Sequence, residues 1–225
     1  MAGKALKREI IKTKDGSQTL FIPELNEQYH SVNGAVQESE HVFINAGFNQ
    51  LKHLEHLRIF EVGFGTGLNA ILSYFHKQNQ KISYHSIEKY PLKQEEYNLL
   101  DFPEFISKNN DLNEVFLLMH LCQWDKYENI SSKFELKKEE ISLIEFLTTQ
   151  SYHLIYFDAF APEIQPNLWT VEVFQKMYDL LEQDGILVTY CAKGQVRRNM
   201  LEVGFNVERI PGPPGKRQMM RAIKS

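Results

Sequence analysis

From residue 57 to the C-terminus, short apolar runs alternate with longer segments in which apolar residues recur at helical spacing. The run LRIFEV at 57–62 has the length and composition of a buried strand, and Leu68, Leu72 and Phe75 after it share one helical face. The pattern predicts strands at 57–62, 82–89, within 152–162, 186–192, 205–210 and 216–224. It predicts helices at 68–78, 91–100, 167–184 and 193–203, a helix and then a loop at 112–130, and strand, turn and short helix at 134–147.

This alternation predicts a Rossmann-like α/β protein with a doubly wound, mostly parallel sheet. The last two strands are joined by the short loop PGPPG at 211–215. A right-handed crossover needs a longer connection, so these strands are expected to form an antiparallel C-terminal hairpin. Gly185 and Gly204 are expected to end the helices that precede them.

Residues 1–50 lack a helical pattern. TLFIP at 19–23 is typical of a strand, and a second short strand is expected at the end of the segment 29–44. We therefore predict an N-terminal strand-and-loop extension at 1–50, which covers a main domain at 51–225 as a lid.

Composition narrows the class of protein. Hydrophobic residues make up 43% and charged residues 24% of the 225 residues, as in globular proteins whose hydrophobic core suffices for folding without disulfides or a structural metal. Cys122 and Cys191 lie far apart, which argues against a disulfide scaffold or a structural zinc site. No apolar run reaches spanning length, and the N-terminus has no signal-peptide core. These features predict a cytoplasmic protein with no bound metal and no membrane association.

The charge is distributed unevenly. The formal net charge is −4, but residues 193–221 contain seven basic and two acidic residues. A solvated tail and a basic binding face both account for this local excess at this point.

The loop EVGFGTGLN after the first predicted strand carries the most specific chemistry. Its glycines are spaced G-x-G-x-G, which is neither a phosphate-binding Walker loop nor the dinucleotide fingerprint G-x-G-x-x-G. A carboxylate at Glu61 would repel a pyrophosphate and attract a cationic amino group instead. Such a ligand, with an ammonium group, a carboxylate and a ribose, is S-adenosylmethionine. The residues expected to approach it are Glu61, Gly63, Gly65, Gly67 and Asn69.

Two further acids fit the same ligand. Glu88 ends the second strand of the main domain, where doubly wound folds place an acid against ribose hydroxyls. Asp158 ends the strand YHLIYF, at the sheet edge where open α/β sheets bind ligands. Each feature alone has a structural explanation, but the ordered set favours a methyltransferase over other nucleotide-binding proteins.

Several motifs resemble one family. EVGFGTGLN, IEKYPL, DAFAP followed by LWT, AKGQVRR and GPPGKRQMMRA are similar to the methyltransferase part of the bifunctional bacterial enzyme that makes 5-methylaminomethyl-2-thiouridine in tRNA. The N-terminal DGSQT and YHSVNGAVQESEHVF resemble that family's leading segment, so the likeness extends from about residue 15 to the end.

The resemblance implies methyl transfer from S-adenosylmethionine to the exocyclic amine of 5-aminomethyl-2-thiouridine at the tRNA wobble position. The chain ends at Ser225, so we expect a stand-alone form without the FAD-dependent oxidase, and separate upstream enzymes are compatible with it. Asp158 is expected to align the amine and accept its proton. Family members often carry an adenine-binding acid after a glycine; here Glu140 is assigned that role without the glycine, and Glu139 is the alternative.

The expected RNA partner is the anticodon stem-loop. Its wobble base is single-stranded and can be splayed out and stacked on an aromatic ring, for which Phe160, Tyr29 and Trp169 are candidates, with a core position favoured for Trp169. The set of residues assigned to the substrate is Tyr29, Phe160, Pro162, Lys193, Arg197, Arg198, Lys216 and Arg217, of which the five basic ones would contact phosphates.

Three alternatives remain at the level of sequence. A small-molecule amine N-methyltransferase and an aminopropyl transferase would use the same fold, but neither explains the basic C-terminal residues. A non-catalytic methyltransferase-like binding subunit is the third alternative, and the presence of Glu61, Glu88 and Asp158 argues against it.

Overall fold

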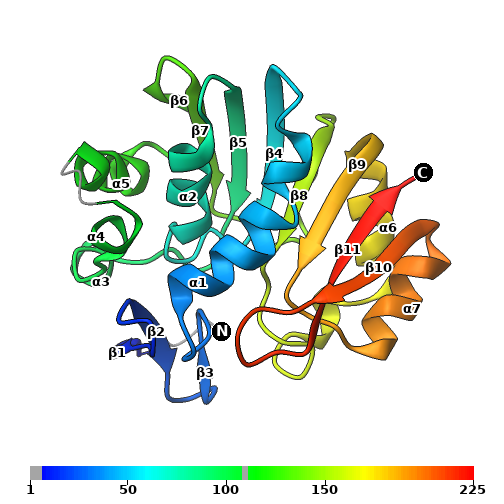
Figure 1. The fold of residues 1–225 in the computed structure, drawn as a ribbon, viewed down its shortest axis with the longest axis horizontal. Coiled ribbons are helices and arrows are strands. Elements are labelled where there is room, and N and C mark those ends of the chain that lie inside the picture. The colour runs from blue at the N-terminus through cyan, green and yellow to red at the C-terminus, as the bar shows by residue number, and fades with distance from the viewer. Residues whose placement is uncertain (1–6, 108–110) are drawn as a thin grey trace.

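The large sheet organises the molecule. The computed structural model describes residues 7–107 and 111–225, and within them eight strands form a sheet in the order β10-β11-β9-β8-β4-β5-β7-β6 (Figure 1). Its five central strands run parallel, and both margins are antiparallel, through β6 against β7 and β11 against β9. The strands are β4 His56–Val62, β5 Lys81–Ile87, β6 Tyr127–Ser131, β7 Phe134–Glu139, β8 Tyr152–Phe157, β9 Leu181–Thr189, β10 Phe205–Pro211 and β11 Gln218–Lys224.

This order confirms the predicted Rossmann-like fold, including the C-terminal hairpin of β10 and β11. The chain leaves β4 toward β5 on one side and later returns to β8 on the other side, so β4 lies at the switch point of the sheet. In open α/β sheets, ligands bind at the carboxyl ends of strands beside such a point. Those ends lie at the lower side of Figure 1, next to the β10–β11 loop.

Helices cover both faces of the sheet because buried parallel strands expose apolar side chains in both directions. Along β8, Leu154 and Tyr156 pack on the face covered by α2 and α5, whereas Ile155 and Phe157 pack on the face covered by α6 and α7. The covering helices are α1 Ala35–Ser39, α2 Leu68–His76, α4 Phe102–Ile106 and α5 Asp111–Leu121 on the first face, and α6 Val171–Leu180 and α7 Gly194–Glu202 on the second.

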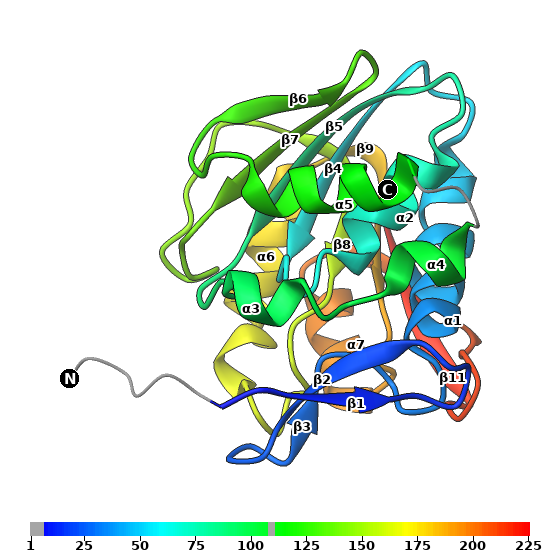
Figure 2. The same ribbon diagram turned by 90° about the vertical axis from the view of Figure 1, so that its left-hand side faces the viewer.

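The N-terminal segment differs from its prediction. A small antiparallel sheet of β1 Glu9–Lys12, β2 Gln18–Ile22 and β3 Glu27–Gln28 lies across the carboxyl ends of the large sheet (Figure 2). After it come helices, where a loop and a strand were predicted: α1, the π-helix η1 Glu40–Asn45 and the 3-10 helix η2 Phe48–Leu51. Polar residues interrupt the apolar pattern of this segment and hide its helical spacing. Residues 1–6 of the predicted extension lie outside the described residues.

Several other helices and strands also differ from the predicted ones. Residues 127–131, predicted as loop, form β6, and the short helix predicted after β7 is a turn instead. The helix predicted at 91–100 is one turn, α3 Gln94–Tyr97. Helix α6 already ends at Leu180, so Gly185 does not cap it. A Cβ at Gly185 would lie 2.8 Å from the carbonyl oxygen of Glu182, so glycine permits a close backbone approach within β9.

We expect Phe43→Ala to destabilise the whole protein, because this ring is 2% exposed in η1 and packs against Tyr156 of the central strand β8. Removing a buried phenylalanine costs about 3–5 kcal/mol. Phe75→Ala is the matched control, since Phe75 of α2 is 45% exposed. Urea unfolding measures both variants, and equal midpoints would show that residues up to 50 fold independently of the sheet.

Candidate active site

The glycine loop between β4 and α2 is folded tightly against its neighbours. Gly63, Gly65 and Gly67 have φ angles of +92°, +50° and +74°, a region that favours glycine. A Cβ at Gly63 would lie 3.1 Å from the carbonyl oxygen of Asp158, and one at Gly65 would lie 3.2 Å from the ring of Tyr29. The glycines therefore allow the loop to run close to both the next strand and the N-terminal segment.

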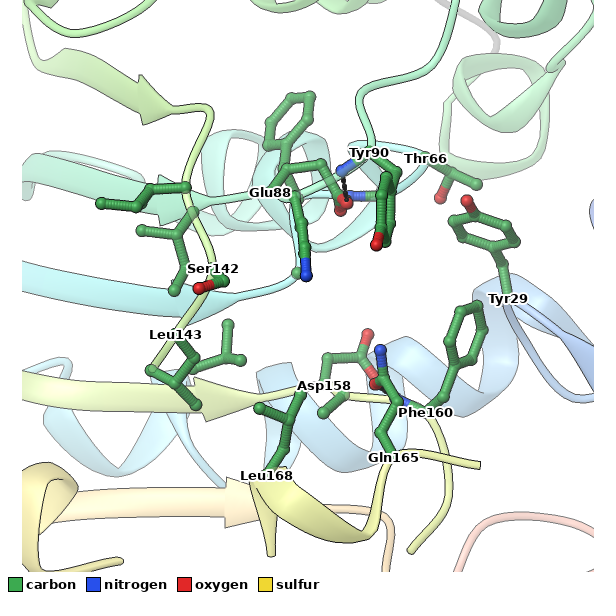
Figure 3. Close-up of a pocket in the computed structure, with 18 of the residues that line it drawn as sticks. Tyr29, Thr66, Glu88, Tyr90, Ser142, Leu143, Asp158, Phe160, Gln165 and Leu168 are labelled. Atoms are coloured by element: carbon green, nitrogen blue, oxygen red, sulfur yellow. Dashed lines mark hydrogen bonds between the residues drawn. The ribbon is translucent and has the colours of Figure 1, made fainter. Parts of the chain in front are cut away.

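A cavity of about 430 Å³ opens at the carboxyl ends of β4, β5 and β8 (Figure 3). Tyr29 and Phe160 lie at one end of it, and Ser142 and Leu143 lie at the other. Of the predicted site residues, those that line it are Tyr29, Gly63, Gly65, Asn69, Glu88, Asp158 and Phe160. The structure thus brings together residues that lie far apart in the sequence.

Glu88 faces the cavity and is held by the backbone. Its Oε2 accepts a hydrogen bond from the amide of Gly65 (3.0 Å), and its Oε1 accepts one from the amide of Tyr90 (2.7 Å). Each carboxylate oxygen can accept further hydrogen bonds. The position and fixed orientation of Glu88 therefore suit it to accept hydrogen bonds from the hydroxyls of a ribose.

Asp158 lies on the opposite wall of the cavity from Glu88. Its Oδ2 accepts a hydrogen bond of 2.9 Å from the side-chain amide of Asn69. Burial raises the pKa of Asp158 from 3.8 to about 7, an effect opposed by Asn69 and reinforced by the negative charge of Glu38. A carboxyl group with such a pKa can accept and release a proton near neutral pH.

Glu61 is not among the described residues that line the cavity, and its contact with a ligand stays a prediction. Its side chain is fully buried and accepts hydrogen bonds from Asn69 Nδ2 (3.1 Å) and Ser86 Oγ (2.7 Å). Burial raises its pKa to about 8, and the nearby Asp158 raises it further. Glu61 therefore supports the cavity wall from behind.

The aromatic end of the cavity is held in place by hydrogen bonds to the DAFAP loop. The rings of Tyr29 and Phe160 meet edge to face, with centroids 5.3 Å apart. The indole of Trp169 donates to the carbonyl of Phe160 (2.9 Å), and the hydroxyl of Tyr190 donates to that of Ala159 (2.8 Å). Trp169 is 3% exposed, which confirms its core position.

Other predicted contacts are not found at the cavity wall. Glu140 is exposed, and Glu139 pairs with His85 and Lys137. Neither residue lines the cavity, because both lie at the end of β7, before the segment 141–145 that does line it. Pro162 and Gly67 are also absent from the described lining residues. A Cβ at Gly67 would meet the His120 ring at 3.1 Å, so this glycine serves packing.

The cavity wall includes residues that the sequence analysis missed. Residues 141–145 form the end opposite Tyr29, and Arg8 and Tyr90 contribute to the rim. One local signal was present: Ser142 and Glu145 have the serine-x-x-glutamate spacing that often starts a turn, and the amide of Glu145 does donate to Ser142 Oγ (3.3 Å). Arg8 and Tyr90 offered no such signal.

The basic C-terminal residues divide into two groups. Lys193 and Arg198 are exposed, paired with Glu163 and Gln195 respectively. Lys216 instead donates to the buried Glu38 (2.7 Å) and lies 4.0 Å from the centre of the Tyr190 ring, so its amine is engaged within the fold. This contact disagrees with the predicted role of Lys216 toward a phosphate. Arg197 is half-buried and Arg217 is exposed.

The side chains that line the cavity suit a cationic ligand with an adenosyl group. The described wall contains the carboxyl groups of Glu88, Glu145 and Asp158 and two long basic side chains, of which Arg8 pairs with Glu96 and Lys89 is the other. These carboxylates suit the sulfonium and ammonium charges and the ribose of S-adenosylmethionine. The glycine loop allows close backbone approach, and Ile141 and Leu143 offer apolar surface for a base. Fold and site together define the class of S-adenosylmethionine-binding α/β domains.

The family follows from comparison with known proteins. Residues 109–225, just over half of the chain, match the model of a family described as S-adenosyl-L-methionine-dependent methyltransferase, and the chain belongs to that family. Among curated relatives, the tRNA 5-methylaminomethyl-2-thiouridine biosynthesis bifunctional protein MnmC of Pseudomonas entomophila is 27% identical over 87% of this chain and 32% of its own length. The MnmC protein of Azoarcus sp. is 28% identical over 86% of this chain and 32% of its length. The chain thus spans about a third of the length of these relatives.

Solved structures agree with this placement. The crystal structure of MnmC2 from Aquifex aeolicus superposes with a TM-score of 0.82 at 28% identity, over 96% of this chain and 70% of that chain. Spermidine synthase from Thermotoga maritima superposes with a TM-score of 0.58 at 14% identity, over 99% of this chain and 70% of that chain, which shows a shared fold alone.

Within residues 7–107 and 111–225, no group of three or more His, Cys, Asp and Glu side chains is arranged to hold a metal ion. None of the helices in this part of the chain has the length and apolarity needed to cross a membrane.

We expect the two buried acids to lower stability in different pH ranges. Each has a raised pKa, so the folded protein holds its proton more tightly than the unfolded chain. This stabilisation is fully present below the ordinary pKa of 3.8 for Asp158 and 4.5 for Glu61, and it is lost progressively up to about pH 7 and about pH 8, respectively. Asp158→Asn should therefore raise the melting temperature at pH 8 relative to wild type, by roughly 2–4 °C.

The same comparison with Glu61→Gln should show a gain that keeps growing up to about pH 8, whereas the gain of Asp158→Asn levels off at about pH 7, and both gains should be much smaller at pH 5. Differential scanning calorimetry from pH 5 to 9 measures both. A gain that is equal at pH 5 and pH 9 would contradict the raised pKa values.

Proposed function

We propose that this protein transfers a methyl group from S-adenosylmethionine to the exocyclic amine of 5-aminomethyl-2-thiouridine at the wobble position of tRNA. The observation that carries the proposal is the position of Asp158. The Asp158 carboxyl group, whose pKa is raised to about 7, lies in the cavity beside the aromatic pair Tyr29 and Phe160. The names of the MnmC relatives supply the substrate, since they describe biosynthesis of 5-methylaminomethyl-2-thiouridine in tRNA.

Asp158 would prepare the amine for attack. An alkyl ammonium group has no free lone pair at neutral pH, so one N–H proton must first pass to a base. The ionised carboxylate of Asp158 accepts that proton, and the neutral nitrogen then forms a bond to the methyl carbon as the carbon–sulfur bond breaks. S-adenosylmethionine, when bound, supplies the methyl group as a sulfonium and leaves as a neutral thioether. Glu88 would bind its ribose.

The aromatic pair would bind the base. A wobble uridine is unpaired in free tRNA, and splayed bases stack on aromatic side chains. Tyr29 and Phe160 line the end of the cavity next to Asp158, and Phe160 is fixed by Trp169 and Gln165. Stacking there would place the C5 substituent of the uridine toward the carboxylate.

The exposed basic residues would bind phosphates. Lys193 and Arg198 belong to the start of α7, and Arg217 to the β10–β11 loop, which lies on the same side of the sheet as the cavity (Figure 1). Phosphate contacts of this kind position an RNA without reading its sequence. Lys216 would act indirectly, since it links this loop to Glu38 of α1.

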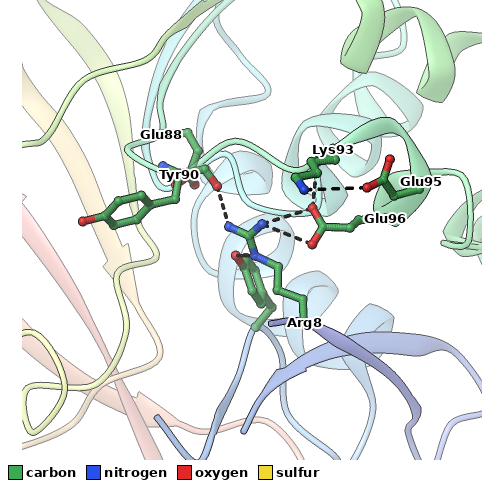
Figure 4. Close-up of polar contacts among 7 residues, drawn as sticks. Arg8, Glu88, Tyr90, Lys93, Glu95 and Glu96 are labelled. Carbon is green, nitrogen blue, oxygen red and sulfur yellow. Dashed lines mark hydrogen bonds and ion pairs between the residues drawn. The ribbon is translucent and has the colours of Figure 1, made fainter. Parts of the chain in front are cut away.

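The N-terminal segment would act as a lid, and Arg8 joins it to the main domain (Figure 4). This guanidinium is 9% exposed; it donates to the hydroxyl of Tyr29 (2.9 Å), the carbonyl of Tyr90 (2.7 Å) and the carboxylate of Glu96 (3.1 Å). Tyr29 lies on the lid, whereas Tyr90 and Glu96 follow β5. Arg8 therefore holds the lid against the segment that carries Glu88.

The first experiment measures methyl transfer. Labelled S-adenosylmethionine is mixed with tRNA from cells that cannot complete the aminomethyl modification, and label is expected in the wobble nucleoside. Asp158→Asn should reduce kcat/KM by about 10²–10⁴-fold, as expected for loss of a general base. Asp179→Asn is the matched control, because Asp179 is exposed on α6.

Label in free amines instead of tRNA would contradict the proposed acceptor and favour a small-molecule transferase. Absence of any transfer, with S-adenosylmethionine still bound, would favour a binding subunit.

Arg8→Ala should loosen the lid and raise KM for tRNA by roughly tenfold, the loss expected for a hydrogen bond to a charged group. Lys7→Ala is the control on the same segment, since Lys7 is exposed and its ammonium group pairs with Glu9. Steady-state kinetics at saturating S-adenosylmethionine measure the change. Equal KM values for the two variants would show that Arg8 does not hold the lid during the reaction.

A further inference from the structure

One side chain connects the two acids behind the cavity. Asn69 is the second residue of α2 and is 3% exposed, yet it lines the cavity. Its Nδ2 donates to Glu61 Oε1 (3.1 Å) and to Asp158 Oδ2 (2.9 Å). Both neighbours present acceptor oxygens, so this orientation of the amide is required: a reversed amide would place its own oxygen against two carboxyl groups.

The oxygen of the Asn69 amide has no hydrogen-bond donor in the part of the chain that the structure describes. Asn69 Oδ1 is buried and has no hydrogen-bond partner among the described residues. A buried acceptor without a donor costs free energy, and such groups in native structures usually have a role other than stability. The fold therefore accepts an unpaired oxygen in order to direct both N–H groups toward acids.

The two acids are not equivalent. Glu61 is fully buried, and Ser86 satisfies its second oxygen, whereas Asp158 lines the cavity and is in reach of a ligand. A single negative charge shared by this pair is less costly at the cavity than behind it. The amide of Asn69 then donates to an ionised Asp158 on one side and to a protonated Glu61 on the other.

We propose that Asn69 is a positioning residue for methyl transfer: its amide, oriented by Glu61, holds the Asp158 carboxylate in place and in the ionised form that accepts a proton. This inference rests on the proposed function only for the identity of the proton donor. It concerns the acid itself, so it can be tested without any methyl acceptor.

Other charged and titratable groups near Asp158 do not replace this contact. Glu38 of α1 raises the pKa of Asp158 and Lys216 of the β10–β11 loop lowers it, but these two form an ion pair of 2.7 Å, so their effects largely cancel. Among the described residues, Glu61, Tyr84 and Tyr190 also interact electrostatically with Asp158.

The test is a carboxyl titration by NMR of protein labelled with ¹³C at aspartate carboxyl groups, with Asp158→Asn used to assign the signal. In Asn69→Ala, the titration midpoint of Asp158 should rise by about one to two pH units, because a hydrogen bond to a charged group is lost. In Glu61→Gln, the midpoint should stay nearly the same, because the glutamine oxygen still orients Asn69 and the glutamate that it replaces is protonated where Asp158 titrates.

Asn199→Ala is the matched control. Asn199 is a buried asparagine of α7 whose amide donates to the carbonyl of Trp169 (2.7 Å), and its loss should lower stability without moving the Asp158 midpoint. Asn69→Ser, a smaller change of volume that cannot reach both acids, is measured in parallel and should raise the midpoint too.

An unchanged midpoint in the folded Asn69 variants, with a loss of stability like that of Asn199→Ala, would overturn the inference. With an active acceptor, the acidic limb of kcat/KM against pH should move by the same amount as the midpoint. A uniform loss of activity at every pH would also overturn it. If no acceptor is found, the proposed function fails, while the NMR titration still decides the role of Asn69.

Discussion

The site depends on two acids that neighbouring parallel strands bring to the same edge of the sheet. β4 ends next to Glu61 and β8 ends at Asp158, so the two carboxyl groups share one small volume at the switch point. Burial and mutual repulsion both favour the protonated form of these carboxyl groups. A single amide, that of Asn69, lies between them and donates a hydrogen bond to each. The glycine loop then fits into the remaining space, since a side chain at Gly63 would touch the backbone of Asp158.

The main sheet could be predicted because fully buried parallel strands are continuously apolar, and their alternation with helices leaves few topologies. The prediction of secondary structure was wrong in the segment of α1 and η1, where only some of the residues are buried. Helices α1 and η1 bury Phe43 but also Glu38, whose carboxylate is stabilised by the amide of Ser31 and by Lys216, 178 residues later. Such a distant partner leaves no local pattern, so the segment resembles a loop in the sequence.

The same distinction applies to the site. Glu88 and Asp158 were predicted correctly as cavity residues because strand ends in a doubly wound sheet have fixed positions. Glu61 and Glu140 do not line the cavity, because sequence does not show whether a side chain at a strand end points into the cavity or away from it. Residues such as Arg8 reach the cavity through the packing of a separate small sheet, which no spacing along the chain reveals.

Fold alone does not distinguish methyl transfer from aminopropyl transfer, since a spermidine synthase superposes over 99% of this chain. The arrangement of acids at the cavity favours the proposed methyl transfer over aminopropyl transfer. A polyamine is a multiple cation and requires several unpaired acids along its length. Here the described wall has three acids. Glu88 is held by two backbone amides, Glu145 accepts a hydrogen bond from Ser142, and Asp158 lies beside the aromatic pair. One acid next to aromatic rings suits a single amine carried by a planar base better than it suits a polyamine.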